Sequence, residues 1–398
     1  MTRVVLDISR LISRVRHARP SGVDRVEMAY ARGLANRYGC DLAFCAVHPT
    51  GWYGRLRREV AEAYLDELER RWADSEGASG QRSLASVLPW MRRLLPTRKG
   101  MRTSDVLVQV SPHHLDRSEL MRHILNAEQV RFVCMVHDLI PIEYPEYARP
   151  GGASQHEARM ANVIELADAV ITNSRSTATS LKRWSDASNR SCPSVHVALL
   201  GTAPVSRASE HGRTDDKPYF VCLGTIEPRK NHLLLLHLWR DMAQSLPADS
   251  IPRLMIIGRR GWENEQILDL LDRSSVLRPF MQEVSSCADS ELAALIRGSK
   301  GLLMPSFAEG YGMPVAEALS AGIPVIASDI AAHREVGQSA PDYLDPLDGI
   351  AWKKSILDYA NDGPLRRAQL DRLCQWVAPD WESHMDIASK VIDDIWRQ

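Results

Sequence analysis

The stretch PSFAEGYGMPVAEALSAGIPVIAS, residues 305–328, contains a strand end, a glycine-rich loop, a helix and a second strand in close succession. Pro314 suits the first helical position, because its missing N–H would have no partner there. Gly322 suits the end of the helix, and residues 324–327 are typical of a buried strand. A glycine-rich loop that opens a helix presents backbone N–H groups and the positive end of the helix dipole to an anion. The stretch therefore predicts an α/β unit with a phosphate site at the start of this helix.

Two carboxylates flank the predicted phosphate site. Glu309 precedes the loop, and Glu317 lies one turn into the helix, eight positions further on. Like charges repel, so these side chains are expected to bind something other than the phosphate, and sugar hydroxyls fit them well. A helix that simply carries surface Glu residues after a loop is the alternative. The combination of phosphate site and carboxylates predicts a nucleotide-sugar site.

This stretch resembles the E-x7-E signature of the family 4 retaining glycosyltransferases, and the resemblance extends over nearly the whole chain. It is strongest from 219 to 345. The resemblance implies an α/β protein of the GT-B fold, with two Rossmann-like domains facing a central cleft and a final helix that crosses back to the N-terminal domain. It also implies transfer of a hexose from a nucleotide diphosphate donor with retained anomeric configuration, and neither a metal nor a cofactor. The site residues that we expect are catalytic His137 and Glu309, and donor-binding Arg229, Lys230, Tyr311, Gly312, Met313, Glu317 and Gly22.

The length of 398 residues favours two domains, because a single ordinary core rarely grows so large. The polar, turn-rich stretch at 203–217 lacks periodicity and marks the boundary. We expect an acceptor-binding domain at 1–203, a nucleotide-sugar-binding domain at 204–378 and a returning helix at 379–398. A helical stripe of apolar residues supports this last helix, at positions 381, 385, 388, 392 and 395. A helix that caps its own domain is the alternative.

Strands and helices alternate along both predicted domains, which argues for parallel sheets. The expected strands are short and continuously apolar, as strands covered on both faces should be. They lie at 4–8, 106–110, 130–136 and 169–172 in the first half, and at 219–223, 254–257, 301–304 and 324–327 in the second.

Composition excludes several classes of protein. There are 49 Lys and Arg against 50 Asp and Glu, so no charge excess favours nucleic acid. Seven Cys without a C-x-x-C pair favour reduced thiols and the cytoplasm. The N-terminal MTRVVLDISRL is too short and polar for a signal peptide, and no apolar run reaches the roughly 20 residues that span a bilayer. We expect a cytoplasmic protein that binds no nucleic acid.

A second motif, GTIEPRKN at 224–231, directly follows an expected strand, where ligands bind in open α/β sheets. A diphosphate at this place needs cations, and Arg229 and Lys230 can supply them. The segment resembles the phosphate-binding stretch of the family, with Lys230 at the position of its lysine. Many members also have Arg directly after the glycine, where this chain has Thr225. Either Arg229 replaces that contact or one phosphate contact is lost.

His137 ends the strand expected at 130–136 and matches a family histidine that faces the donor sugar. A satisfied core histidine is the alternative. HDLIPIEYPEY at 137–147 and GRRGW at 258–262 resemble bacterial mannosyltransferases of surface-polysaccharide pathways, in which the second segment lies near the base. The resemblance implies mannose from GDP-mannose and a saccharide or lipid-linked saccharide acceptor. A UDP-sugar donor, a GT-B enzyme of another reaction class and a non-catalytic carbohydrate-binding or scaffold protein stay open.

Two basic stretches suggest further contacts. Residues 9–25 take the place of the family's first glycine-containing loop, and Gly22 and Arg25 would form an anion site at a helix start. Residues 82–102 intermix six Arg or Lys with Trp90 and aliphatic side chains, without an acidic residue. Such a mixture favours peripheral contact with anionic lipids at the inner face of the cytoplasmic membrane. Ordinary loop solvation is the alternative for residues 9–25. A mobile loop, or a pair of helices broken by Pro89 and Pro96, is the alternative for residues 82–102.

Overall fold

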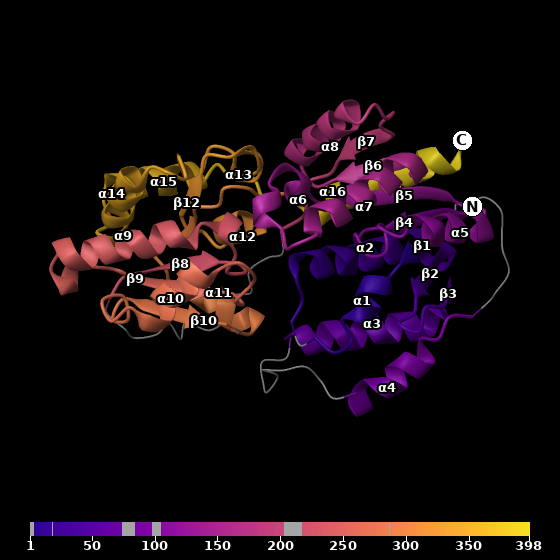
Figure 1. The fold of residues 1–398 in the computed structure, drawn as a ribbon, viewed down its shortest axis with the longest axis horizontal. Helices are drawn as coiled ribbons and strands as arrows, with labels where there is room; N and C mark the ends of the chain where they lie inside the picture. Colours follow the sequence, from indigo (N-terminus) through magenta and orange to yellow (C-terminus); the bar gives the residue numbers. More distant parts are fainter. Residues whose placement is uncertain (1–3, 18, 74–83, 98–104, 203–216, 286) are drawn as a thin grey trace. The chain divides into compact units, whose positions relative to one another are not determined.

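The chain forms two units, each built on its own β-sheet (Figure 1). A computed structural model describes residues 4–17, 19–73, 84–97, 105–202, 217–285 and 287–398. Unit 1 comprises Met1–Ile142, Gly151–Gly201 and Asp380–Gln398, and unit 2 comprises Glu143–Pro150 and Thr202–Pro379. The sequence assigns 143–150 to the first domain, whereas the contacts of this segment place it with unit 2.

Unit 1 contains a seven-stranded sheet in the order β3-β2-β1-β4-β5-β6-β7. Every neighbouring pair is parallel except β2 and β3. Helices cover the sheet, so its central strands are buried along nearly their whole length. The strands are β1 Val4–Asp7, β2 Leu42–Val47, β3 Tyr53–Arg55, β4 Val106–Gln109, β5 Arg131–Val136, β6 Ala169–Thr172 and β7 Ser194–Val197. The helices are α1 Ser9–Ser13, α2 Gly22–Tyr38, α3 Arg58–Ala73, α4 Leu84–Arg93, α5 Ser118–Glu128, α6 Ile140–Glu143, α7 Gly152–Leu166, α8 Arg175–Ala187 and α16 Trp381–Trp396.

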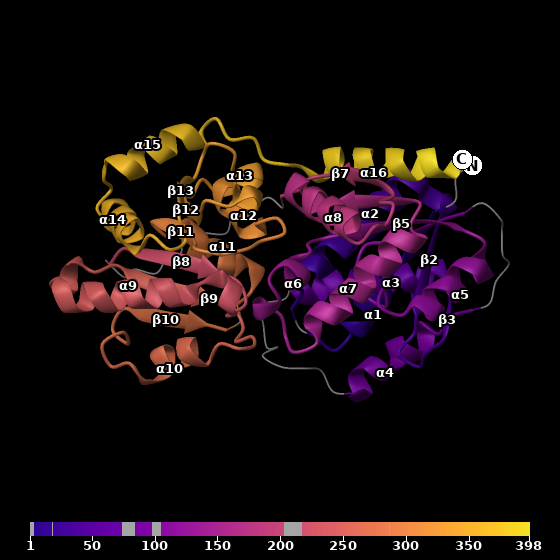
Figure 2. The ribbon, with the colours of Figure 1, turned by 45° about the horizontal axis from the view of Figure 1, so that its top comes forward.

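The last helix, α16, belongs to unit 1 and packs against α2 (Figure 2). Asp380 caps it by accepting a hydrogen bond from the backbone N–H of Ser383 at 2.7 Å. Four of the five positions in the predicted apolar stripe are buried, namely 385, 388, 392 and 395. His384 fixes the helix further, with Nδ1 3.0 Å from the carbonyl oxygen of Leu199 and Nε2 2.9 Å from the hydroxyl of Tyr30.

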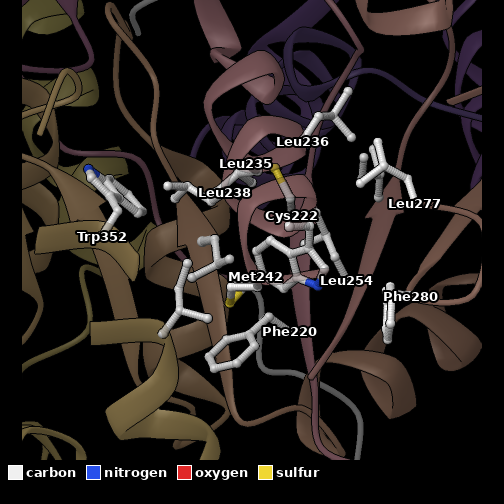
Figure 3. Close-up of a cluster of buried hydrophobic side chains, with 14 of the residues drawn as sticks. Phe220, Cys222, Leu235, Leu236, Leu238, Met242, Leu254, Leu277, Phe280 and Trp352 are labelled. Carbon is white, nitrogen blue, oxygen red and sulfur yellow. The ribbon is translucent and has the colours of Figure 1, made fainter. Parts of the chain in front are cut away.

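Unit 2 contains a six-stranded parallel sheet in the order β10-β9-β8-β11-β12-β13. Its strands are β8 Tyr219–Leu223, β9 Arg253–Ile257, β10 Met281–Val284, β11 Gly301–Met304, β12 Val325–Ser328 and β13 Asp342–Leu344. Its helices are α9 His232–Ser245, α10 Glu265–Arg273, α11 Asp289–Arg297, α12 Met313–Ser320, α13 Ala331–Gly337, α14 Gly349–Ala360 and α15 Pro364–Leu373. A core of large side chains joins the sheet to α9 and α14, with Phe220, Met242, Leu254 and Trp352 among its members (Figure 3).

The eight strands expected from the sequence are all present, each within one residue of its predicted ends. The helix expected after the glycine-rich loop is α12, with Pro314 in its first turn and Gly322 just beyond its end at a φ of 75°. Within the described residues the sheets contain five further strands, β2, β3, β7, β10 and β13. No helix in the described part of the chain combines the length and the apolar character needed to cross a membrane.

Unit 1 also contains a buried carboxyl that carries a proton. Glu27 on α2 is fully buried, and its Oε1 accepts a hydrogen bond from the backbone N–H of Leu11 at 3.3 Å. Burial, together with the charge of the neighbouring Asp7, raises the pKa of Glu27 to about 8. Burial also raises the pKa of Asp7, at the end of β1, to about 6. Glu27 is therefore uncharged in the folded protein at neutral pH.

We expect the free energy of unfolding to decrease as the pH rises from about 4.5, the ordinary pKa of Glu27, to about 8. The unfolded chain releases this proton first, so the stabilisation is complete below the lower value and lost above the upper one. Glu27→Gln cannot titrate and should remove the slope of the unfolding free energy between pH 6 and 8, which amounts to roughly 1.4 kcal/mol per pH unit.

Urea denaturation at several pH values measures this slope. Glu157→Gln, at an exposed position of α7, is the matched control and should keep it. An unchanged slope in the Glu27 variant would show that another group causes the pH dependence.

Candidate active site

The candidate site lies at the carboxyl ends of β8 and β11, which are neighbours in the sheet of unit 2. The chain runs outward from β8 through β9 to β10 and then returns to β11 on the other side of β8. Such a reversal opens a crevice between the loops that follow the two central strands, where open α/β sheets bind ligands. GTIEPRKN follows β8, and the loop containing Glu309 follows β11, so the fold brings both predicted motifs together.

Two glycines allow the loops after β8 and β9 to meet. Gly224 has a φ of 140°, and its N–H donates to the carbonyl oxygen of Ile257 at 3.0 Å. A Cβ at Gly258 would overlap the carbonyl oxygen of Gly224. Ile226 then donates to the carbonyl oxygen of Arg259 at 2.9 Å, so GRRGW directly supports GTIEPRKN.

Glu309 is the centre of the site. It receives three hydrogen bonds from side chains: Lys230 Nζ lies 2.5 Å from Oε1, Ser306 Oγ lies 2.8 Å from Oε1, and Arg229 Nη1 lies 2.7 Å from Oε2. Arg229 also donates to the carbonyl oxygen of Ala308 at 2.9 Å. The loop after β11 is thereby tied to the short 3₁₀ helix Pro228–Lys230 that follows β8.

The cations keep Glu309 ionised despite its burial. Burial alone would raise its pKa, but the charges of Arg229 and Lys230 outweigh burial and hold the pKa well below the ordinary value. Glu227 forms a second pair, with Oε1 2.6 Å from Arg229 Nε. Burial raises the pKa of Glu227, and Arg229 and Lys230 oppose this rise. Both predicted phosphate-binding cations are therefore already paired with carboxylates.

The glycine-rich loop ends at the N-terminus of α12, as predicted. Gly312 precedes the helix with a φ of 101°, and Met313 is the first helical residue. Tyr311 is buried, and Glu317 is half-buried one turn into the helix. The first N–H groups of α12 thus adjoin the Glu309 loop, which is the arrangement expected for a bound phosphate.

The structure places His137 in unit 1, directly after β5. Its Nε2 lies 2.8 Å from the carbonyl oxygen of Val110, so this nitrogen carries the hydrogen. Burial lowers the pKa of His137, which leaves the ring neutral at pH 7 with Nδ1 as an acceptor. Asn173 Nδ2 donates to the backbone carbonyl of His137 at 2.9 Å and fixes the turn.

Gly22 is the first residue of α2, also in unit 1, as expected for a helix-start site. Ser21 and Asp24 form a complete capping box at this helix start. Arg10 Nε lies 2.6 Å from Asp24, and Arg14 pairs with the same carboxylate at 3.4 Å. An acidic side chain thus already occupies the first turn and holds part of the basic charge of residues 9–25.

Sequence reasoning assigned no role to three residues that contact this site. Ser306 and Glu227 stand inside the quoted motifs, and a polar side chain shortly after a predicted strand was an available signal. His333, on α13, belongs to no quoted motif, yet its ring lies against Gly312. No sequence pattern indicates this contact.

A pocket of about 370 Å³ in unit 2 lies beside the cluster formed by Glu309, Arg229 and Lys230. Phe307 and Tyr147 line it, and their rings stack with centroids 6.0 Å apart. Phe307 also connects the pocket to the cluster, because its N–H donates to the carbonyl oxygen of Arg229 at 2.8 Å. Trp262 of GRRGW fixes the Tyr147 segment by donating to its carbonyl oxygen at 3.0 Å.

Comparison with known proteins identifies the class to which this site belongs. Residues 207–368 match the family Glycosyl transferases group 1, so the chain carries a glycosyltransferase domain of that family. The chain is similar in structure to sucrose-phosphate synthase from Thermosynechococcus elongatus, with a TM-score of 0.65 at 16% identity over 100% of both chains. It is also similar to Anabaena Alr3699/HepE in complex with UDP, with a TM-score of 0.62 at 15% identity over 99% of this chain and 100% of that one. These neighbours confirm the GT-B fold expected from the sequence.

Several curated relatives are named mannosyltransferases. The serotype-specific mannosyltransferase WbdA of Escherichia coli is 29% identical over 234 residues, which make up 54% of this chain and 28% of WbdA. O-antigen chain mannosyltransferase B of Escherichia coli is 33% identical over 168 residues, or 42% of this chain and 43% of that protein. The matched regions thus span less than half the length of these relatives.

Gly258→Ala should disrupt the site from a distance, because its methyl group would overlap the Gly224 carbonyl oxygen and separate the loops after β8 and β9. We expect a loss of more than about 2 kcal/mol in the free energy of unfolding and weaker nucleotide binding. Differential scanning calorimetry and titration calorimetry measure the two effects.

Gly349→Ala is the matched control in the same unit. Its Cβ would meet only side-chain carbons of Leu238 and Leu234, at 3.4 and 3.6 Å, at the start of α14. This variant should be neutral or slightly stabilised. Equal losses in both variants would contradict the steric explanation.

Proposed function

We propose that the protein is a retaining hexosyltransferase that needs no metal ion and uses a nucleotide diphosphate sugar as donor. The observation that carries the proposal is the ionised Glu309, held by Lys230 and Arg229 beside the N-terminus of α12. The helix N–H groups and the two cations can take up charge on the departing diphosphate. A carboxylate in the same place can orient sugar hydroxyls, which would leave Glu317 for the ribose. Front-face attack by the acceptor follows the family resemblance.

The roles that we propose for the other expected site residues follow from the family resemblance. His137, with a neutral ring, would contact the sugar or its leaving phosphate as a hydrogen-bonding group. Tyr311, Gly312 and Met313 would offer backbone N–H groups to the diphosphate, and Gly22 would lie at a second helix start. No cofactor is part of this mechanism, since the donor itself supplies the leaving group.

We propose GDP-mannose as the donor and a saccharide or lipid-linked saccharide of a bacterial surface polysaccharide as the acceptor. Support comes from the similarity to WbdA and to O-antigen chain mannosyltransferase B, which are both named mannosyltransferases. A UDP-sugar donor is the second candidate, favoured by the structural similarity to Alr3699/HepE in complex with UDP. A non-catalytic carbohydrate-binding protein is a weaker candidate, because it would have no need for an ionised, buried carboxylate.

Product analysis tests the reaction class and the donor together. With GDP-mannose and a saccharide acceptor we expect a product with the anomeric configuration of the donor, visible by proton NMR, and full activity in EDTA. GDP should bind more tightly than UDP in titration calorimetry, because a pocket built for one base leaves polar groups unpaired with another. An inverted product would refute the mechanism, whereas tighter UDP binding would change the donor alone.

Glu309→Gln separates binding from turnover. The amide has no charge to hold the cations, so Lys230 and Arg229 become available to the diphosphate. We expect kcat to fall about 100-fold or more, as for loss of a transition-state contact, while nucleotide affinity stays equal or rises. Glu291→Gln, at an exposed position of α11, is the control for a change of net charge. Unchanged kcat would remove Glu309 from the catalytic residues.

Peripheral membrane contact through 82–102 remains part of the proposal. Of this stretch, 84–97 is described: Trp90 packs edge-on against Tyr64 with ring centroids 5.4 Å apart, and Arg93 lies over its ring. Leu88 and Leu95 are about half exposed. Arg98 and Lys99 lie outside the described residues. The exposed leucines beside cations are the feature that suits a lipid surface.

Sedimentation with anionic vesicles tests this contact. Replacing Arg92 and Arg93 by Gln should weaken binding roughly 10- to 30-fold, since each cation adds about 1 kcal/mol near an anionic surface. The same change at Arg240 and Arg278, both exposed in unit 2, alters the net charge equally and should have little effect. Equal losses in the two double variants would indicate a diffuse charge effect instead.

A further inference from the structure

His333 is a fully buried histidine with one ring nitrogen engaged and the other without a partner. Its Nδ1 lies 3.0 Å from the carbonyl oxygen of Ser328, and a carbonyl only accepts, so Nδ1 carries a hydrogen. Its Nε2 is buried and has no hydrogen-bond partner among the described residues. The hydroxyl of Tyr343 donates to the backbone carbonyl of His333 at 3.1 Å and fixes its place. A buried polar atom in this state indicates a partner that the ligand-free protein does not supply.

The unpartnered nitrogen faces the start of α12. A Cβ placed on Gly312 would lie 3.1 Å from Cδ2 and 3.8 Å from Nε2 of His333, so this edge of the ring faces the residue that precedes the helix. The N-terminus of α12 attracts an anion through its N–H groups and its dipole. Two independent features, a helix start and an unpartnered buried nitrogen, therefore converge on one point.

The charged groups around this point are already balanced. Arg229 pairs with Glu227 and Glu309, and Lys230 pairs with Glu309, so two cations face two carboxylates. An arriving diphosphate meets no surplus positive charge in this cluster. A protonated histidine at the same place would supply one.

In the ligand-free protein the ring is neutral at pH 7. Burial lowers the pKa of His333, and Lys230 and Arg229 lower it too, while Glu309 and the Ser328 carbonyl act in the opposite direction. These are the charged groups that face the ring from the loops after β8 and β11. A diphosphate placed at the start of α12 would add negative charge and favour the imidazolium.

We propose that His333 takes up a proton when the diphosphate of a nucleotide sugar binds at the N-terminus of α12, and that its Nε2–H then faces the bound diphosphate. The proton comes from solvent, occupies the free Nε2 lone pair and returns to solvent when the nucleotide leaves. This inference rests on the proposed function, because it requires a diphosphate ligand at this site. His333 would be a donor-binding residue whose charge appears only in the complex.

Titration calorimetry with GDP-mannose, without acceptor, tests the proposal in buffers of different ionisation enthalpy. The diphosphate of a nucleotide sugar is a diester and does not titrate near neutrality, so any proton uptake belongs to the protein. We expect uptake of up to one proton per nucleotide at pH 7.5. Affinity should fall by up to tenfold per pH unit between pH 7 and 9.

His333→Asn keeps an N–H donor close to the position of Nδ1 but cannot titrate. We expect no proton uptake and an affinity independent of pH in this variant. His333→Gln is the second variant, with an amide nearer the position of Nε2, and should behave in the same way. Uptake that persists unchanged in either folded variant would overturn the proposal.

His232 provides the matched control in the same cluster. It is fully buried, both of its ring nitrogens lack partners among the described residues, and burial lowers its pKa to about 3. Because burial and the charge of Lys230 hold the pKa of His232 far below neutrality, His232→Asn should keep the proton uptake. Loss of uptake in His232→Asn alone would assign the proton to His232 and overturn the proposal.

The outcomes also separate this inference from the proposed function. Tight binding of GDP-mannose, or of UDP-glucose measured in parallel, with no proton uptake would reject the role of His333 and leave the enzyme class intact. Binding of neither nucleotide sugar would reject the proposed function, and the inference with it.

Discussion

The contact on which the site depends is the one between Glu309 and the cations of the 3₁₀ helix Pro228–Lys230. It joins the loops that follow two neighbouring strands, β8 and β11, at the edge where α/β sheets bind ligands. Placing these charges out of water costs free energy that their attraction only partly offsets, so the cluster is a weak source of stability. The cluster instead fixes the geometry of the site. Moving the loops apart would leave a buried charge without its partner, which is costly, so the two loops are held in place relative to each other.

The close approach of the loops depends in turn on residues without side chains. Gly258 leaves room for the carbonyl oxygen of Gly224, and Gly312 leaves room for the ring of His333. At Gly224 and Gly312 the backbone also has a positive φ, which other residues adopt only with strain. The backbone itself thus forms the wall of the site, and the charged side chains are held against it. This explains why motifs from three parts of the chain meet at one sheet edge.

The features that could be predicted from the sequence are those that a short run of neighbouring residues determines. Interior strands are continuous apolar runs, so eight of them were found within one residue of their ends, and Glu309 and Lys230 stood out because they follow such strands. Strands β7, β10 and β13 are partly exposed and short, which weakens that signal. The strand β2 was missed although its residues LAFCAV are apolar and mostly buried. The place of His333 depends on packing between α13 and the start of α12, which no local pattern contains.

The pairing around Glu309 has a consequence for product release under the proposed function. Sugar transfer converts a diphosphate diester into a free nucleotide diphosphate, which carries more negative charge near neutral pH. A site with fixed surplus cations would hold this product more tightly than the donor and slow turnover. In the present cluster, Arg229 and Lys230 can return to Glu309 and Glu227 as the product leaves, because these carboxylates lie within hydrogen-bond distance. Glu309 and Glu227 therefore weaken the attraction between the two cations and the bound diphosphate, and in the same way they assist departure of the nucleotide.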